Sequence, residues 1–265
     1  MEEHRDRLEL RTTFETVAER YDAARPTYPE ALLDDLVELG GMPPGGRILE
    51  IGPGTGKASV ALAGRGYALV GIELGPQLAE VARRNLAPFP KARVVVADFE
   101  QWEPLEPEEP FDAVVAFTAF HWIAPDVRYA KPAQLLREGG ALAVVGTMHV
   151  LPAGADPFWK EVQADYDAVV PRPDNRPPLA PEEVDDLRQE LEATGLYRDV
   201  EVRRHLWEVE YGPDEYVAVL GTYSEHLALP APQREELFAR IHDRVAARGR
   251  VRKTYLAVLN VARKP

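Results

Sequence analysis

The sequence predicts an α/β fold in which a mostly parallel sheet carries helices on both faces. Between residues 46 and 151, short apolar runs alternate with segments of helical spacing, which is the pattern of βαβ units. The runs consist mainly of Val, Ile, Leu and Ala, as expected of parallel strands buried on both sides. A glycine-rich turn, Gly52-Pro53-Gly54-Thr55-Gly56, joins the first run to the helix that follows it.

The composition is that of an ordinary globular protein. The 265 residues are 45% hydrophobic and 28% charged, which argues against disorder and against a coiled coil. A net charge of −13 disfavours nucleic acid and anionic membranes as partners. The absence of Cys excludes disulfides, thiolate metal sites and Cys nucleophiles. No apolar run is long enough for a membrane helix, and the charged N-terminal segment is unlike a secretory signal, so we expect a cytoplasmic protein.

The N-terminal segment is predicted to form two helices. Residues 12–21 carry apolar side chains at helical spacing, and the two prolines of the segment ARPTYPE then interrupt the helix. A second helix follows Pro29 and continues through Leu39, until Gly40-Gly41 ends it.

The next hundred or so residues alternate between strands and helices. Helices are predicted over 56–66, 76–86 and 132–140, and the last of them ends at two glycines. The strands that they connect are predicted over 47–51, 67–73, 92–98, 111–120 and 141–150.

After residue 151 the pattern changes to proline-rich segments and further helices. Strands are predicted over 199–211 and 251–263. In the first of them polar and apolar residues alternate, as in a strand with one solvent-exposed face. With these the sheet has seven strands. The helices are predicted over 157–169, 181–194, 213–220 and 232–247. We therefore expect one domain over 1–265 with a core over 46–151. Helical insertions over 152–197 and 213–247 are expected to form a substrate cap, and the final strands lie within 198–212 and 250–263.

The glycine turn and three acidic residues indicate a nucleotide-like ligand. Glycines let the backbone take positive φ angles and approach a ligand without a Cβ, and open α/β sheets bind ligands at the carboxyl end of the first strand. Glu50 precedes the turn, Glu73 ends the second strand and Asp98 ends the third. Glu73 is placed to accept two hydrogen bonds from ribose hydroxyls, and Asp98 to meet an adenine amino group.

This arrangement, E-x-G-x-G-x-G with an acid after each of the next two strands, resembles the class I S-adenosylmethionine-dependent methyltransferases. The resemblance implies a Rossmann-like sheet of seven strands. A nicotinamide-binding turn instead has the pattern G-x-G-x-x-G, and Lys57 and Ala58 stand where its last glycine belongs. A carboxylate before the glycines also suits a cationic ligand better than a pyrophosphate.

Four other segments resemble small-molecule methyltransferases in particular. They are Y-D-x-A-R-P-x-Y-P (21–29), F-x-A-F-H-W (117–122 with Thr118 in second place), L-R-E-G-G (136–140) and T-Y-S-x-H (222–226). By this resemblance, residues 1–45 form a helical lid, in which Tyr21, Arg25 and Tyr28 cover the cofactor. The other cofactor contacts that it implies are Glu50, Gly52, Pro53, Gly54, Thr55 and Gly56 at the amino-acid part, Glu73 and Leu74 at the ribose, Asp98 and Phe99 at the adenine, and Thr118, Ala119 and Phe120 at the mouth of the fourth strand.

The candidate catalytic and substrate residues have structural alternatives. His121 and His149 lie near the carboxyl ends of strands and are candidate general bases, but the F-H-W segment is equally well a packing turn anchored by Trp122. Tyr223 and His226, in the predicted cap, and Trp122 are candidate substrate contacts or structural groups. No cluster has metal-ligand spacing, so we expect no metal.

The sequence thus predicts an S-adenosylmethionine-dependent methyltransferase that acts on a small-molecule acceptor at O, N or C. The fourth strand is not followed by an Asn-Pro-Pro-Tyr type segment, which with the acidic charge makes nucleic acid a poor acceptor. Two alternatives remain: a nicotinamide-dependent oxidoreductase and a methyltransferase-like module that binds without turnover. The identity of the acceptor, the methylated atom and the oligomeric state do not follow from the sequence.

Overall fold

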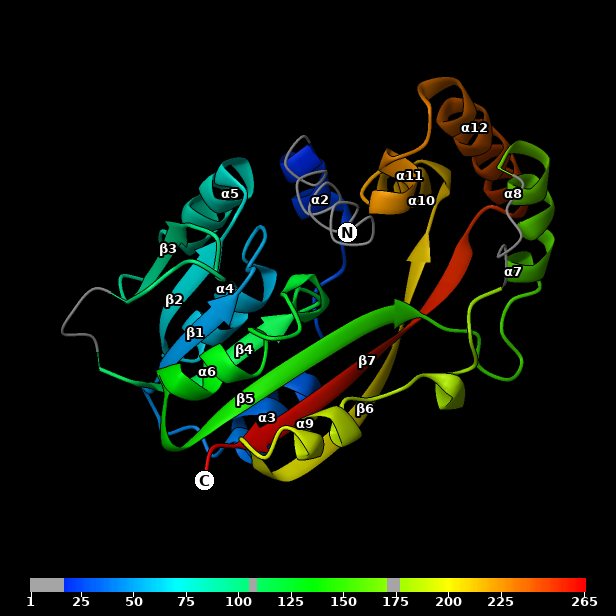
Figure 1. Cartoon of the computed structure of the whole chain (residues 1–265). Helices are drawn as coiled ribbons and strands as arrows, with labels where there is room; N and C mark the ends of the chain where they lie inside the picture. Colours follow the sequence, from blue (N-terminus) through cyan, green and yellow to red (C-terminus); the bar gives the residue numbers. More distant parts are fainter. Residues whose placement is uncertain (1–16, 105–108, 171–176) are drawn as a thin grey trace.

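The computed structural model describes residues 17–104, 109–170 and 177–265, and Figure 1 shows their arrangement around one sheet. In the described residues the sheet has seven strands in the order β3-β2-β1-β4-β5-β7-β6. β1 to β5 run parallel to one another, and β7 runs antiparallel between β5 and β6. The strands are β1 (Arg47–Ile51), β2 (Ala68–Glu73), β3 (Ala92–Val96), β4 (Phe111–Phe117), β5 (Leu136–His149), β6 (Arg198–Tyr211) and β7 (Val251–Arg263). The predicted fold class is confirmed.

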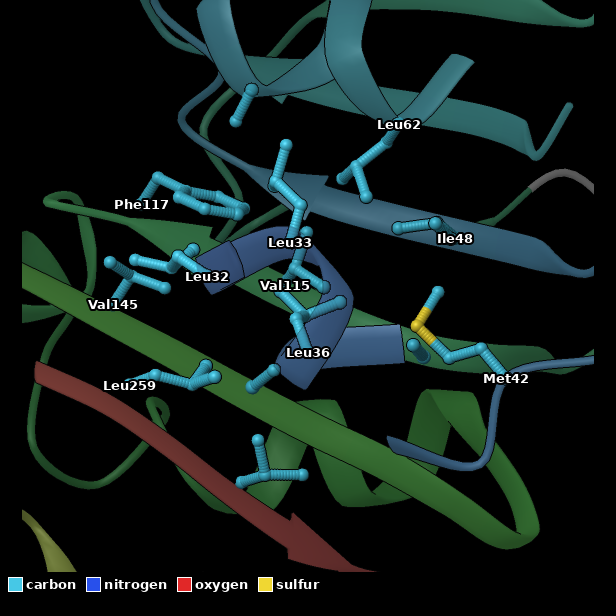
Figure 2. Packing of buried hydrophobic residues seen from close by; sticks show 14 of the residues in the cluster. Leu32, Leu33, Leu36, Met42, Ile48, Leu62, Val115, Phe117, Val145 and Leu259 are labelled. Atoms are coloured by element: carbon cyan, nitrogen blue, oxygen red, sulfur yellow. The ribbon is translucent and has the colours of Figure 1, made fainter. Parts of the chain in front are cut away.

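Helices cover both faces of the sheet because its central strands are apolar on both sides. One face carries α3 (Glu30–Gly40), α4 (Lys57–Gly64) and α5 (Pro76–Leu86). Figure 2 shows the centre of this layer, where Leu32, Leu33 and Leu36 of α3 lie against side chains of β4, β5 and β7. The other face carries α6 (Ala130–Leu135) and α9 (Arg188–Ala193). The helix predicted after Pro29 is therefore core, and only the segment before it is placed to form a lid.

A second group of helices lies beyond the sheet, where β6 and β7 extend past their neighbours (Figure 1). These helices share a separate hydrophobic core that includes Phe158, Trp159 and Tyr216, and Tyr255 of β7 joins it. The N-terminal helix α2 (Ala18–Ala24) contacts both α5 and α10. We call this group the cap; it consists of α7 (Phe158–Glu161), α8 (Gln163–Val169), α10 (Pro213–Leu220), α11 (Ser224–Leu227) and α12 (Ala231–Arg248).

Several predicted boundaries differ from those in the structure. The helix predicted over 132–140 ends at Leu135, since Leu136 already pairs with Phe111 and Arg137 forms an ion pair with Asp112 at 2.6 Å. The helix predicted over 157–169 is divided at Val162 into α7 and α8. The strand predicted over 111–120 ends at Phe117, and a 3-10 turn, Phe120–Trp122, follows. The strand predicted over 92–98 ends at Val96. Residues 12–16 of the first predicted helix lie outside the described residues.

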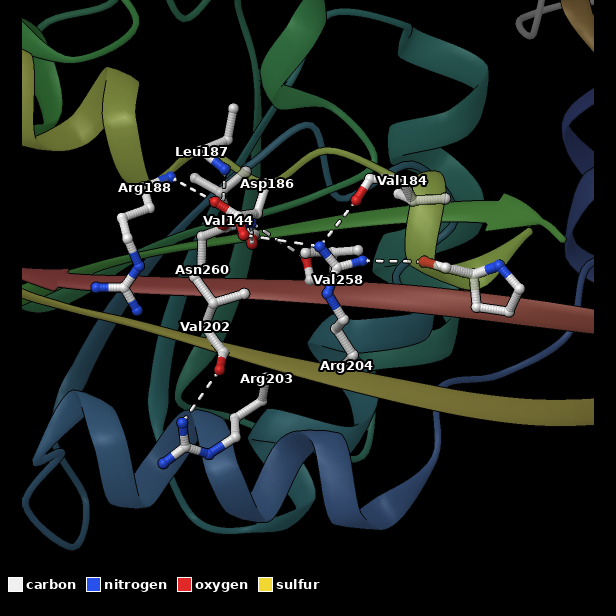
Figure 3. Close-up of polar contacts among 11 residues, drawn as sticks. Val144, Val184, Asp186, Leu187, Arg188, Val202, Arg203, Arg204, Val258 and Asn260 are labelled. Atoms are coloured by element: carbon white, nitrogen blue, oxygen red, sulfur yellow. Dashed lines mark hydrogen bonds and ion pairs between the residues drawn. The ribbon is translucent and has the colours of Figure 1, made fainter. Parts of the chain in front are cut away.

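The segment predicted as one helix over 181–194 is a 3-10 turn, Pro181–Glu183, followed by α9. Between them the chain is tied to the sheet, as Figure 3 shows: the backbone N–H of Leu187 donates to Asn260 Oδ1 at 2.9 Å, and Arg204 donates to the carbonyls of Pro181 and Val184. Val184 is buried against Val258 of β7. This part of the predicted insertion 152–197 therefore covers the sheet instead of joining the cap.

Among the described residues, no helix combines the length and the apolar character needed to cross a bilayer.

Candidate functional site

The glycine turn follows β1 and brings the backbone close to the segment after β4. Gly52, Gly54 and Gly56 have φ angles of 63°, 59° and 88°, a region that is unfavourable for residues with a Cβ. A Cβ on Gly52 would lie 2.7 Å from the Cβ of Ala119, so no larger residue fits there. The Oγ1 atom of Thr55 is buried and has no hydrogen-bond partner among the described residues. The turn thus leaves the Thr55 hydroxyl available for a ligand.

Two buried carboxylates flank this turn. Glu73, which is 6% exposed, accepts hydrogen bonds from the backbone N–H groups of Gly54 (2.8 Å) and Gly75 (2.9 Å). Glu50, which is 1% exposed, accepts a hydrogen bond from Ser59 Oγ at 2.5 Å. Burial, and to a smaller extent the charge of Glu73, raises the pKa of Glu50 to about 7 in spite of the bond from Ser59. Glu50 therefore changes charge near neutral pH, and a cation bound beside it would favour its ionised form.

A cavity of about 770 Å³ extends from the glycine turn to the cap. Most of its wall comes from elements far apart in the sequence: α2, the ends of β1, β4 and β5, the cap helices and β7. The predicted site residues that line it are Tyr21, Arg25, Tyr28, Glu50, Gly52, Pro53, Gly54, Thr55, Thr118, His149, Tyr223 and His226.

The other predicted residues do not line this cavity. Phe99 and Phe120 are 4% and 3% exposed and belong to the core of the face covered by α6 and α9. The Asp98 carboxylate accepts a hydrogen bond from the N–H of Glu100 at 3.0 Å and so caps its own turn. The remaining residues outside the lining are Gly56, Glu73, Leu74, Ala119, His121 and Trp122.

The predicted lid residues connect α2 to the cap. Arg25 donates from Nε to Thr222 Oγ1 (2.8 Å) and from an Nη to the Thr222 carbonyl (3.0 Å). Its guanidinium also lies 4.0 Å from the ring centre of Tyr223. The Tyr28 ring packs 4.8 Å from that of Phe117, and burial raises the pKa of its hydroxyl well above the usual range. The lid is thus held by specific contacts on both sides of the cavity.

The three histidines singled out in the sequence lie in different surroundings. The His121 residue is exposed, and its ring lies tilted against that of Trp122 with 4.6 Å between the ring centres. Partial desolvation of the ring, followed by the charge of Arg128, lowers its pKa. In His149, burial and then the charge of Lys253 lower the pKa to about 2, so this imidazole is neutral. His226 is buried and its Nε2 lies 2.9 Å from the hydroxyl of Tyr166. Only the last two line the cavity.

Sequence reasoning missed Lys253, which lies on β7 and lines the cavity. Its sequence signal is weak, because the same 13-residue strand also contains Arg252 and Arg263. Missed too were Lys57, whose Nζ donates to the carbonyl of Asp22 at 2.7 Å, and Tyr255, which pairs with His149 across the sheet.

The described residues contain no group of three or more His, Asp or Glu side chains that could hold a metal ion.

Comparisons with known proteins agree with this geometry. Residues 48–140 match the family model described as a methyltransferase domain. An uncharacterized methyltransferase of Mycobacterium tuberculosis is 30% identical over 139 residues, which is 52% of this chain and 54% of that protein. The chain thus spans about half the length of the curated relatives that it matches first.

Solved structures share the fold over most of the chain. A provisionally assigned type II methyltransferase of Anaeromyxobacter dehalogenans has a TM-score of 0.63 and 22% identity, with 90% of this chain and 97% of that one covered. Phosphoethanolamine N-methyltransferase 2 of Haemonchus contortus, solved with phosphomonomethylethanolamine and S-adenosylhomocysteine, has a TM-score of 0.55 and 18% identity over 99% of this chain and 60% of that one. Residues 48–140 thus match a methyltransferase domain, and the glycine turn, the seven-stranded sheet and the similar structures support a class I S-adenosylmethionine-dependent methyltransferase.

Proposed function

We propose that the protein transfers a methyl group from S-adenosylmethionine to the O, N or C atom of a small-molecule acceptor. The observation that carries this proposal is that one continuous cavity joins the glycine turn to the cap. Its volume of about 770 Å³ falls within the range of roughly 300–1,000 Å³ that is common for small-molecule sites. The net charge of −13 disfavours nucleic acid as the acceptor.

The residues around the glycine turn fit the cofactor. Backbone that carries no Cβ at Gly52 and Gly54 can approach its amino-acid part, and Glu50 offers a carboxylate to its positive charge. The carboxylate of Glu73, at the end of β2, is the proposed partner of the ribose hydroxyls. When bound, the cofactor supplies a methyl group already activated on a positively charged sulfur, whose departure as a sulfide needs no acid.

The protein's own task is then to bind, orient and exclude water. Tyr21, Arg25 and Tyr28 close one side of the cavity, and the cap closes the other. A base is required only for an acceptor that must lose a proton. His149 is a poor general base because a pKa of about 2 leaves its protonated form unstable, and it is better suited to hydrogen bonding as a neutral ring.

Calorimetric titration with S-adenosylmethionine, S-adenosylhomocysteine and NAD tests the cofactor. We expect micromolar binding of the first two and none of NAD. Failure of both adenosyl ligands to bind to the folded protein would overturn the proposal, and binding of NAD would favour an oxidoreductase. Formation of S-adenosylhomocysteine in the presence of a pool of small acceptors then separates an enzyme from a module that binds without turnover.

A further inference from the structure

The cap end of the cavity contains a buried lysine that forms no ion pair among the described residues. Lys253 is 3% exposed, and its Nζ donates one hydrogen bond, to the hydroxyl of Tyr223 at 2.8 Å. No Asp or Glu of the described chain lies within 4.0 Å of this nitrogen. An ammonium group has three N–H donors, and a buried charge without a counter-ion is costly. Two donors of Lys253 thus lack a polar partner within the described protein.

Aromatic rings surround this ammonium group. Its nitrogen lies 4.8–5.8 Å from the ring centres of Tyr223, Tyr255, Tyr216 and Trp159. Ring faces attract a cation and offset part of the cost of burying it, but they do not accept its hydrogen bonds as an oxygen does. Burial lowers the pKa of Lys253, whereas Tyr223 acts in the opposite direction. An anion bound beside this lysine would favour its charged form.

A second donor lies beside it. His149 pairs with Tyr255 between β5 and β7, and its ring contacts that of Trp159 at 4.1 Å. Its Nε2 atom is buried and has no hydrogen-bond partner in the part of the chain that the structure describes. A neutral imidazole carries one N–H, so a proton on Nε2 would point at no acceptor of the protein.

Charged side chains line the cavity at both of its ends. Glu50 and Lys57 stand at the glycine turn, and Glu225, the other acid in the lining, is an exposed residue of the cap helix α11. At the cap end stand Lys253 and Arg25, and the Arg25 guanidinium lies against the ring of Tyr223. The positive cap end is unusual in a chain with a net charge of −13, and such a local excess favours anions.

We propose that the cap end of the cavity binds a carboxylate of the methyl acceptor, with Lys253 Nζ and His149 Nε2 as its hydrogen-bond donors. This inference rests on the proposed function and names its substrate class: an organic acid whose apolar or aromatic body packs against Trp159, Tyr216 and Tyr255. Two neighbouring donors match the two oxygens of a carboxylate. A phosphate group, with three oxygens, would need more donors than these two.

Paired acids and amides test this site in the protein saturated with S-adenosylhomocysteine. The probes are benzoate, cinnamate and hexanoate, each compared by calorimetry with its uncharged amide. We expect at least one acid to bind tenfold or more tightly than its amide. We expect Lys253→Met to remove this preference and His149→Phe to weaken it. Lys160→Met, at an exposed lysine on α7, is the matched control and leaves the preference unchanged.

The outcomes separate this inference from the proposed function. Acids that bind no better than their amides to the wild-type protein would overturn the carboxylate site, and this comparison does not depend on any variant. A preference retained in Lys253→Met would overturn the role of Lys253. Tighter binding of phenyl phosphate than of every acid would replace the carboxylate with a phosphate. If the wild-type protein does not bind S-adenosylhomocysteine at all, the result would instead contradict the proposed function.

Discussion

The carboxylate of Glu73 accepts a hydrogen bond from the backbone N–H of Gly54, with 2.8 Å between Oε2 and N. This bond links the end of β2 to the turn that follows β1, where Gly54 has a φ of 59°. The other carboxylate oxygen accepts the N–H of Gly75. Glu73 therefore holds the glycine turn in shape, in addition to its predicted contact with the ribose.

Glu73→Ala should weaken the binding of S-adenosylmethionine tenfold or more. Hydrogen bonds to a charged group contribute about 1.5–3 kcal/mol, and 1.4 kcal/mol corresponds to roughly a factor of ten in affinity. Calorimetric titration measures the change. Glu80→Ala, at an exposed residue of α5, is the control and should bind as the wild type does. Unchanged affinity in a folded Glu73→Ala variant would remove Glu73 from the site.

The affinity for S-adenosylmethionine should rise with pH around neutrality. Because the pKa of Glu50 is about 7, most molecules carry a neutral carboxyl at pH 6 and a carboxylate at pH 8. A cationic ligand favours the carboxylate, so affinity should increase by about tenfold between these two pH values. In Glu50→Gln, titrations across the same range should show a much smaller change. Parallel pH profiles in the two proteins would place the titrating group elsewhere.

The same carboxyl should make the folded protein less stable as the pH rises. Its pKa is about 7 when folded and near the ordinary value of 4.5 when unfolded, so between these values the folded state binds the extra proton. Stability is thus highest below pH 4.5 for this group and falls as the pH passes through 7, by roughly 3 kcal/mol in total. Urea denaturation at pH 8 should accordingly find Glu50→Gln more stable than the wild type. A wild type that is as stable as Glu50→Gln at pH 8 would contradict the buried, raised pKa.

Much of the fold follows from local sequence, as β7 and α10 illustrate. The predicted strand 251–263 and helix 213–220 match the observed limits, because each has a continuous pattern and clear end signals. The helix predicted over 181–194 was wrong in its middle because Val184 and Leu187 are fixed by β7, through burial against Val258 and a bond to Asn260. Contacts with residues some 70 positions away override local helical preference, and no local pattern contains them.

The candidate site was predictable only where it is continuous in sequence. The glycine turn and its flanking acids lie within a few residues of a recognisable strand, so pattern and spacing indicate them. Lys253 and His149 meet only because β7 lies beside β5 and α10 and α11 fold over both. This pairing joins residues about a hundred positions apart, and it depends on the sheet order, which the sequence alone did not determine.

The Thr118→Gly variant should be more stable than the Thr118→Ala variant. It has a φ of 56°, a region in which a β-branched residue is strained by about 1–3 kcal/mol. Thr118→Ala keeps a Cβ and therefore most of the strain, whereas Thr118→Gly removes it, so urea denaturation should find the glycine variant about 1 kcal/mol more stable. The same pair at Asp199, with a φ of 52°, should differ by a similar amount, because the comparison is again between Ala and Gly at a positive φ. A glycine variant no more stable than the alanine variant would show that Thr118 is not strained.

Arg25→Met should loosen α2 from the cap. The substitution removes two hydrogen bonds to Thr222 and the contact with the Tyr223 ring, while an apolar stem of similar length remains. Because a hydrogen bond from a charged group is worth about 1.5–3 kcal/mol, amide hydrogens of Ala18–Ala24 should exchange at least tenfold faster in mass-spectrometric measurements. Arg20→Met, at an exposed position of the same helix, should exchange as the wild type does. If Arg25→Met also exchanged at the wild-type rate, packing of Ala18 against α5 would be sufficient to hold the helix, and Arg25 would not fasten the lid.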